Sequence, residues 1–418
     1  MKILIISYLF PPVGGGGVQR VKTLAEFLLS KGSDVSVYTE SVNRYKYDAF
    51  DFNNSVDKRI RVLTKSGVDK NRVKNHVKNK QNSRKVSSNK PLFFKIIFNI
   101  IKRIIKLPFP DGHRSYMYHG IKWALMTKEK YHVVIGSVRP PSNAVIAYFY
   151  SLLKNATLII EYRDLWYGQE FQESTSLMVR GINKIYERII LKRASLIVCV
   201  SPEYIRTLKS RHPVISNKFK LITNGFSEQY FKFAPKKEFK NKKDYTTIAH
   251  FGRFYGPRKI DELLNSLSEL TRKIEFLHFG PDILNSTLDL DQINFFKQMG
   301  YLSFADSWRL QQDINIDVLF LIEYTSDNIP GKVFEYYASN KPIIIICPNK
   351  SVLREIFVDV EQFYFIDNLK MEEIGEVIEI IMMKKANKTI IKRKMDLFLR
   401  DKLYERYYEH IKKLKSKG

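Results

Sequence analysis

MKILIISYLFPPVGGGGVQRVKTLAEFLLSKGSDVSVYTE, residues 1–40, decides the fold of the chain. Residues 2–6 form a short apolar strand, and four glycines, Gly14 to Gly17, follow it closely. Segment 18–31 then has apolar residues at helical spacing, and residues 34–39 alternate as a second strand. Strand, loop, helix and strand make one unit of a parallel α/β sheet. Because glycine loses the most conformational freedom on folding, four in a row require a tight turn or the close approach of a ligand.

The same alternation of strands and helices returns along the rest of the chain. Residues 1–230 contain one series, and a second starts after a lysine-rich segment, 231–247, that we interpret as an interdomain linker. The second domain is expected over 248–395, followed by a closing helix over 396–418 that packs back toward the first domain. The sequence therefore predicts an α/β protein whose two domains face each other across a cleft. Ligands bind such sheets at the carboxyl ends of the strands, which places the glycine loop at the mouth of the cleft.

The composition, with 44% hydrophobic and 27% charged residues, is that of a globular protein. No segment approaches the roughly 20 apolar residues that a membrane span needs. The apolar start runs into two prolines and the glycine loop instead of a signal-peptide cleavage site. Cys199 and Cys347 both lie in apolar runs and are expected to be buried, reduced thiols. We therefore expect a cytoplasmic protein.

The formal net charge of +27 indicates an anionic partner or surface. Sixteen Lys or Arg residues and a single acid, Asp69, lie between Lys58 and Lys106. The first part of this segment is predicted to be a basic loop, and residues 91–106 an amphipathic helix with a cationic stripe. This helix either packs on the core or lies in an anionic membrane interface. Nucleic acid is not an expected partner, because the sequence has no aromatic-basic recognition module and no zinc pattern.

The glycine loop matches neither of the common phosphate-binding fingerprints. In the dinucleotide pattern G-x-G-x-x-G, counted from Gly14 or Gly15, the last position falls on Gln19 or Arg20. The pattern G-x-x-x-x-G-K-[ST] is also absent. These failures disfavour a dehydrogenase. The loop is either a structural turn or a set of backbone amides that open a helix toward an anionic or sugar ligand.

Cations and carboxylates gather in two motifs of the second half. HFGRFYGPRK (250–259) places Arg253 just after a strand and Lys259 at the start of a helix. Two such cations can grip two phosphates, unless the loop is merely solvated. In the second motif, DNIPGKVFEYYASNKP (327–342), a proline stands at the first helical position.

The start of this predicted helix combines free amides with charges of both signs. Gly331 and Lys332, which follow Pro330, offer backbone N–H groups and a positive charge. Asp327 and Glu335 are eight residues apart and bracket the helix start. Such an arrangement suits a sugar–phosphate–ribose ligand, with each carboxylate accepting from hydroxyls. The alternative is that Asp327 only caps the helix and Glu335 faces water.

Taken together, the motifs resemble those of the GT-B retaining glycosyltransferases, in particular the large family 4 group that uses nucleotide-sugar donors. The resemblance rests on the order of PPVGGGGVQR, GRFYGPRK and IPGKVFEY, together with FPD, SVRPPSNAV, EYRDLW, VSPEY and ITNGF. These motifs span nearly the whole chain. FPD, SVRPPSNAV and EYRDLW look like landmarks of bacterial cell-surface polysaccharide members. The resemblance implies a GT-B fold of two Rossmann-like domains, which face each other across a cleft.

The resemblance also implies roles for individual residues. Gly16 and Gly17 match the loop that approaches the donor sugar and diphosphate, and Arg253 and Lys259 match the basic pair that holds the diphosphate. Glu335 matches the second acid of the E-x7-E motif, which binds the ribose. The remaining matches are Asp327, in the place of the first acid but one methylene shorter, and the helix-start residues Pro330, Gly331 and Lys332 on the donor side.

The acceptor side is expected in the first domain, where Arg139, Arg163 and Asp164 follow predicted strands. For Arg163 and Asp164 the alternative is a buried ion pair that supports the loop. A histidine that many relatives carry in this region is absent from GSVRPPS. The sequence DLD (289–291) matches a short acidic pattern of metal-dependent transferases, but it lies in a loop far from the other motifs. We therefore expect no metal and no other cofactor, with a nucleotide-diphosphate sugar as the donor substrate.

The resulting hypothesis is a glycosyltransferase on the cytoplasmic face of the membrane. It would transfer a sugar, with retention of configuration, to a hydroxyl of a lipid-linked or cell-surface glycan precursor. A nucleotide-sugar epimerase of the same fold is the main alternative, although it has no need for a membrane-seeking helix. A non-catalytic anion- or nucleic-acid-binding protein would explain the charge of +27 but leaves the 327–335 motif without a purpose.

Overall fold

The structure of the protein is a computed structural model, which describes residues 1–14, 16–41, 56–65, 67–68, 110–168, 177–233, 244–254, 260–270, 272–283, 286–367, 370–386 and 395–415. Most of the predicted basic segment 58–106 and most of the predicted linker 231–247 lie outside these residues, as do Arg258 and Lys259. The chain divides into two compact units. Unit 1 comprises Met1–Ile222 and Tyr404–Gly418, and unit 2 comprises Thr223–Leu403.

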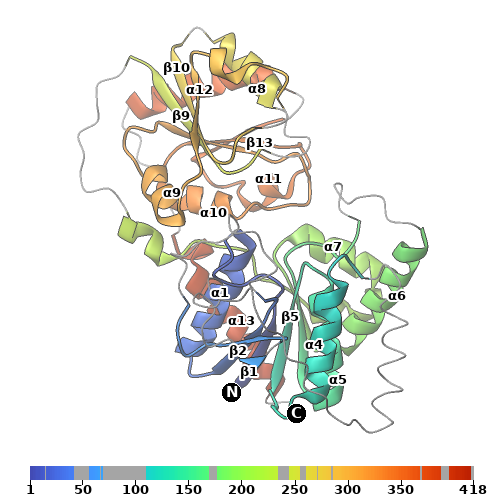
Figure 1. The fold of residues 1–418 in the computed structure, drawn as a ribbon. Coiled ribbons are helices and arrows are strands. Elements are labelled where there is room, and N and C mark those ends of the chain that lie inside the picture. The colour runs from blue at the N-terminus through green and yellow to red at the C-terminus, as the bar shows by residue number, and fades with distance from the viewer. Residues whose placement is uncertain are drawn as a thin grey trace. The chain divides into compact units, whose positions relative to one another are not determined.

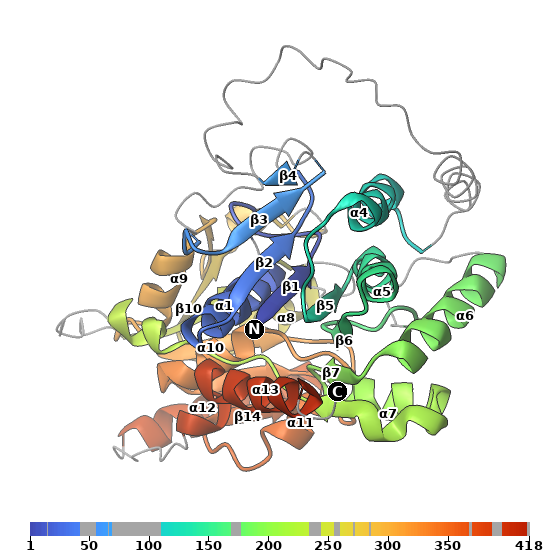
Figure 2. The ribbon, with the colours of Figure 1, turned by 90° about the horizontal axis from the view of Figure 1, so that it is seen from below.

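Unit 1 is built on an eight-stranded sheet with helices on both faces (Figures 1 and 2). The strand order is β4-β3-β2-β1-β5-β6-β7-β8, and all pairs are parallel except β3 with β4. Its strands are β1 (Lys2–Ile6), β2 (Asp34–Tyr38), β3 (Arg61–Thr64), β4 (Gly67–Val68), β5 (Val133–Val138), β6 (Thr157–Tyr162), β7 (Leu196–Cys199) and β8 (Phe219–Leu221). Its helices are α1 (Gly16–Ser30), α4 (Arg114–Met126), α5 (Ser142–Lys154), α6 (Leu177–Arg193), α7 (Pro202–Arg211), the 3-10 helix η3 (Pro213–Lys218) and, from Tyr404 onward, α13 (Arg400–Lys415).

Unit 2 is built on a six-stranded parallel sheet in the order β11-β10-β9-β12-β13-β14. Its strands are β9 (Thr246–Phe251), β10 (Ile274–Phe279), β11 (Phe296–Gly300), β12 (Val318–Ile322), β13 (Ile343–Ile346) and β14 (Phe363–Ile366). The α-helices are α8 (Ile260–Ser268), α9 (Phe304–Gln311), α10 (Lys332–Ser339), α11 (Val352–Ile356) and α12 (Ile374–Ala386). The short 3-10 helices are η4 (Glu228–Phe233), η5 (Leu290–Gln292), η6 (Met371–Glu373) and η7 (Met395–Phe398).

Burial explains why the central strands could be recognised in the sequence. Every residue of β5, β9, β12 and β13 is buried, as expected for parallel strands that are covered on both faces. Cys199 and Cys347 are buried free thiols, as predicted. The predicted α/β class with two parallel sheets is thus confirmed.

In both sheets the strand order reverses at one place. In unit 1 the chain moves from β1 outward to β2 and later resumes on the other side at β5, and in unit 2 it does the same from β9 to β10 and then at β12. Ligands of open α/β sheets bind at such switch points, outside the carboxyl ends of the strands. The segments after β1, β5, β9 and β12 are therefore where functional residues are expected. These segments contain most of the predicted site residues.

Candidate functional site

In unit 2, the end of β9 is tied to the first turns of α10. The Lys332 ammonium donates to the Phe251 carbonyl oxygen, and the Phe251 N–H donates to the Tyr336 hydroxyl at 3.0 Å. Gly252 has φ +122°, and a Cβ there would lie 1.3 Å from Nζ of Lys332. Only glycine combines this backbone conformation with the close approach of the lysine. These contacts bring Arg253, which is exposed and follows directly, to the same sheet edge as the start of α10.

The end of β10 lies next to the end of β9, on the side opposite β12. A Cβ on Gly280 would lie 1.9 Å from the carbonyl oxygen of Gly252, so the two strand ends approach as closely as backbone allows. Of the predicted pair of cations, Arg253 lies at this edge, and Lys259 falls outside the described residues. The edge is therefore a backbone-lined surface with a cation beside it. This construction suits the close approach of an anionic ligand.

The turn between β12 and α10 is organised by a buried carboxylate, Glu323. It accepts hydrogen bonds from the backbone N–H and hydroxyl of Thr325, at 3.1 and 2.8 Å, and from the Asn328 side-chain amide at 2.8 Å. This network fixes the loop that carries Asp327, whose side chain is partly exposed. Sequence reasoning missed Glu323, although its place at the end of a buried strand was a usable signal.

Helix α10 starts without a side-chain cap. Gly331 stands at the N-cap position, where it has no side chain, and the Pro330 carbonyl accepts from the Val333 N–H at 3.1 Å. The positive end of the helix dipole thus points at the loop that carries Asp327. The ammonium of Lys332 points back to β9, where it donates to the Phe251 carbonyl oxygen. In this structure Lys332 therefore joins the end of β9 to α10.

Glu335 lies in the first turn of α10 and is partly buried near α9. Burial raises the pKa of the Glu335 carboxyl. The side chains of Trp308 and Gln311 on α9, and the positive charges of Arg400 and Lys332, oppose that rise. A carboxylate in this position is kept in place by neighbours that favour its charged form. The side chain is only partly exposed to water.

Two histidines lie beneath this edge. His250 Nδ1 and His278 Nδ1 are 3.1 Å apart on the neighbouring strands β9 and β10, and His278 Nε2 lies 3.2 Å from the Pro281 carbonyl oxygen. Because a carbonyl only accepts, Nε2 of His278 carries a proton, and Nδ1 of neutral His278 accepts from His250. The pair therefore needs His278 to be neutral, because its Nδ1 can accept only when it carries no proton.

Burial lowers the pKa of His278, and the charge of Lys332 lowers it further, against the Pro281 carbonyl and Asp282. A base with a depressed pKa in the folded state stabilises the protein above its unfolded pKa of about 6.5 and loses that stability as the pH falls below it. We expect denaturant unfolding to show lower stability at pH 5.5 than at pH 7.5, because the folded state resists protonation of His278. His278→Phe should show a smaller difference between the two pH values, and an equal difference would contradict this assignment.

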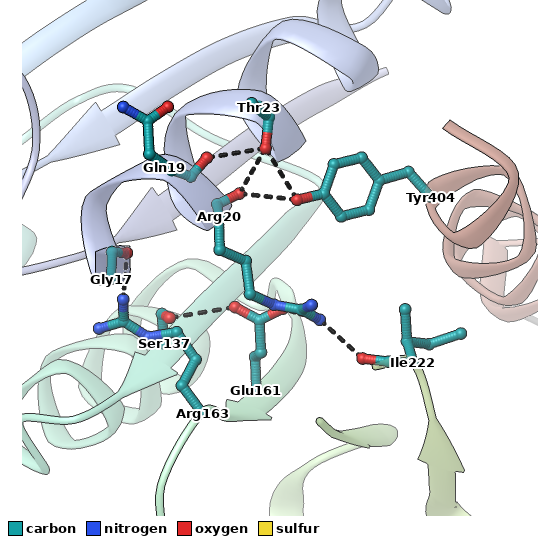
Figure 3. A network of polar contacts seen from close by, with 9 residues as sticks. All are labelled: Gly17, Gln19, Arg20, Thr23, Ser137, Glu161, Arg163, Ile222 and Tyr404. Atoms are coloured by element: carbon teal, nitrogen blue, oxygen red, sulfur yellow. Dashed lines mark hydrogen bonds and ion pairs between the residues drawn. The ribbon is translucent and has the colours of Figure 1, made fainter. Parts of the chain in front are cut away.

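In unit 1, Arg163 holds the glycine loop to the segment after β5 (Figure 3). Its guanidinium donates to the Gly17 carbonyl oxygen and, at 2.6 Å, to the Arg139 carbonyl oxygen. Burial lowers the pKa of Arg163, against the charges of Glu161 and Asp164. Arg139 in turn lies with its Nε 3.4 Å from the Leu165 carbonyl oxygen. Arg163 therefore acts on two backbone carbonyls, one in α1 and one just after β5.

The predicted landmarks FPD and SVRPPSNAV meet at the start of α5. The Asp111 carboxylate accepts from the Ser142 N–H and hydroxyl, both at 2.7 Å, and from the His113 N–H at 2.7 Å. This carboxylate stabilises the helix N-terminus beside Arg139. Gly16, at the start of α1, and Asp164, after β6, lie at the same carboxyl edge of the sheet.

A buried ion pair between Arg20 and Glu161 underlies this edge (Figure 3), and sequence reasoning missed it. Arg20 Nε lies 3.0 Å from Glu161 Oε1, and the two side chains are 5% and 1% exposed. Glu161 also accepts from the Ser137 hydroxyl at 3.0 Å, and Arg20 donates to the Ile222 carbonyl oxygen at 3.0 Å. The pair joins α1 to β6 and to the end of β8. Arg20 and Glu161 both lie in quoted motifs, which was the available signal.

The structure resembles several solved enzyme structures over nearly its whole length. Sucrose-phosphate synthase from Thermosynechococcus elongatus is 14% identical, with full coverage of both chains and a TM-score of 0.63. HepE from Anabaena, in complex with UDP and glucose, is 13% identical, with 99% of this chain and 100% of that chain covered and a TM-score of 0.61. The UDP-GlcNAc 2-epimerase from Neisseria meningitidis is 11% identical over 99% and 100% of the two chains, with a TM-score of 0.51. At these identities the likeness shows the fold.

The sequence comparison is more specific. No curated protein matches the chain. Residues 14–230, more than half of the chain, match the profile of Glycosyltransferase Family 4. The matched region contains the glycine loop, the Arg20–Glu161 pair and the Arg163 contacts. The chain therefore belongs to glycosyltransferase family 4 and is a glycosyltransferase of the GT-B fold.

Proposed function

We propose that the protein transfers a sugar from a nucleotide-diphosphate sugar to a hydroxyl of a lipid-linked or cell-surface glycan precursor, with retention of configuration and without a metal. One observation supports the donor-binding part of this proposal most directly. In unit 2, Lys332 and Tyr336 tie the end of β9, next to Arg253, to the start of α10 at the switch point of the sheet. This arrangement puts a cation and a helix N-terminus at one edge, and both favour a diphosphate.

The charges suit the departure of a nucleoside diphosphate. When the anomeric bond breaks, positive charge develops on the sugar and negative charge on the diphosphate. Arg253, Lys259 and the amides at the start of α10 would stabilise the diphosphate, and such fixed electrostatic stabilisation is usually the largest catalytic term. Attack from the leaving-group face then retains the configuration, with a phosphate oxygen taking the acceptor proton. Because protein cations balance the diphosphate charge, this scheme needs no metal.

The remaining predicted residues have roles on either side of this reaction. On the donor side, Glu335 would accept from the ribose hydroxyls, and Asp327 from the donor sugar. In unit 1, Gly16 and Gly17 would present backbone to the sugar and diphosphate. Arg139, Arg163 and Asp164 would shape the acceptor side, with Arg163 acting through the Gly17 carbonyl.

The positive charge of the chain supports our proposals for the acceptor and for the location of the protein. The basic segment 58–106 favours an anionic membrane surface, where a lipid-linked acceptor would be found. Among the residues that the structure describes, no helix has both the length and the apolar character to cross a bilayer. On the basis of the charged segment, we propose peripheral association with the cytoplasmic face of the membrane, with nucleic acid not among the partners.

A thermal-shift screen against nucleoside diphosphates and their sugars tests this function. A ligand that binds only the folded state raises Tm. At 100 times its Kd it adds about 2.7 kcal/mol to the free energy of unfolding. At least one nucleoside diphosphate is expected to raise Tm, and NMR of the products should then show a new glycoside only when an acceptor is present. If free, epimerised nucleotide sugar forms in reactions without an acceptor, the protein is a nucleotide-sugar epimerase instead. No shift with any nucleotide would contradict the donor assignment.

A further inference from the structure

Helix α6 exposes a row of apolar side chains. Leu177, Gly181, Ile185 and Ile189 follow one another at intervals of four residues, which places them on one face of the helix. Leu177 is 84% exposed, Ile185 59% and Ile189 43%. Large aliphatic side chains scattered singly on a surface are normal, but three of them aligned on one face of a helix, with only Gly181 between, indicate a partner.

A second row on α6, one step around the helix, is entirely basic. Arg180, Lys184, Arg188 and Lys192 also recur every four residues, and all four are exposed. The only acid of α6, Glu187, is buried on the opposite side of the helix. There it accepts from the Tyr162 hydroxyl at 2.9 Å and lies 3.1 Å from His212 Nε2. The outward face of α6 is therefore apolar and cationic, without an acid.

The helices beside α6 continue this character. Helices α4, α5 and α6 lie side by side along one face of the unit 1 sheet (Figures 1 and 2). Together their sequences contain eight Lys or Arg residues, and their one acid is Glu187. At the end of α5, Leu152 and Leu153 are 49% and 43% exposed. The apolar and basic character thus extends beyond a single helix.

We propose that the outward face of α6 docks unit 1 onto an anionic lipid surface. A helix with an aliphatic row beside a Lys/Arg row suits the boundary between acyl chains and anionic headgroups, because each row meets its own environment. A second copy of the chain fits less well, since it would bring two basic rows together without acids to pair them. This inference rests on the proposed function, which includes a lipid-linked acceptor, and it names the surface that would contact the membrane.

Co-sedimentation with vesicles tests the docking face without any need for donor or acceptor. The probes are vesicles of phosphatidylcholine alone and of phosphatidylcholine with phosphatidylglycerol. The wild-type chain should bind only the anionic vesicles, and more weakly as salt rises from about 0.1 M to 0.5 M. Ile185→Gln with Ile189→Gln, or Lys184→Gln with Arg188→Gln and Lys192→Gln, should each reduce the partition coefficient by about tenfold or more.

The matched control is Ile380→Gln with Met383→Gln, which replaces two exposed apolar side chains on α12 of unit 2. This variant should bind vesicles like the wild type. Unchanged binding by both α6 variants would overturn the proposal, as would absence of binding by the wild type. Self-association that is lost in the Ile185/Ile189 variant, without vesicle binding, would assign the face to a second copy. Because the screen for nucleotide binding is separate, failure of the docking face leaves the proposed reaction standing, and the reverse also holds.

Discussion

Glu335→Gln is expected to lower sugar transfer by about a hundredfold while leaving the protein folded. A hydrogen bond to a charged group contributes up to about 3 kcal/mol, and each 1.36 kcal/mol corresponds to a factor of ten in rate. Burial already disfavours the charge of Glu335, so a neutral amide of the same shape should cost little stability. The combination of lost activity and retained stability is what distinguishes a ligand-binding carboxylate from a structural one. Steady-state kinetics and denaturant unfolding of the same preparations measure both.

The control for this prediction is Glu376→Gln, an exposed glutamate on α12 of the same unit. Its activity and stability should match the wild type within experimental error. If Glu335→Gln retains wild-type turnover, or loses activity only because it unfolds, then Glu335 does not bind the donor and the site at the start of α10 is misassigned.

Arg20→Met is expected to destabilise the protein by about 3–5 kcal/mol, because it leaves the carboxylate of Glu161 buried without its partner. The lost hydrogen bond to the Ile222 carbonyl oxygen adds to this cost. Both effects fall in unit 1, where the Tyr404 hydroxyl also donates to the Arg20 carbonyl oxygen at 3.0 Å (Figure 3). Urea unfolding of wild type and variant gives the difference in free energy directly.

The double variant Arg20→Met with Glu161→Leu separates charge from packing. It removes both members of the pair, so it should recover most of the stability that Arg20→Met loses. Arg59→Met, whose side chain is 71% exposed in an ion pair with Asp57 of the same unit, is the matched control and should leave stability unchanged within experimental error. A loss below 1 kcal/mol in Arg20→Met would show that the pair is not buried as described.

The sequence was most informative where burial is complete. The central strands β5, β9, β12 and β13 are continuous apolar runs because helices cover both faces of each sheet. The edge strand β11 was not recognised, because Lys297 and Gln298 on it are exposed and interrupt the apolar pattern. Helix α9 was missed as well, because it is only eight residues long and buries just Trp308 and Gln311.

The candidate site, like the fold, could be predicted from the sequence only in part. Motif reading located Arg253 and the start of α10 at the ends of strands, because position along a strand is a local property of the sequence. The contacts that join these segments are long-range. Lys332 meets Phe251 81 residues away, and Arg20 meets Glu161 141 residues away. Such contacts follow from strand order, which the sequence alone left open, and so the supporting roles of these residues emerge only from the structure.

Hydrogen–deuterium exchange tests the donor site most directly. The nucleoside diphosphate that gives the largest thermal shift would be added at saturation, and exchange would be compared with and without it. The account predicts slower exchange of backbone amides in 250–254 and in 327–339, at the ends of β9 and β12 and the first turns of α10. Saturating binding with no protection in either segment, or with protection confined to regions such as 289–300, would contradict it.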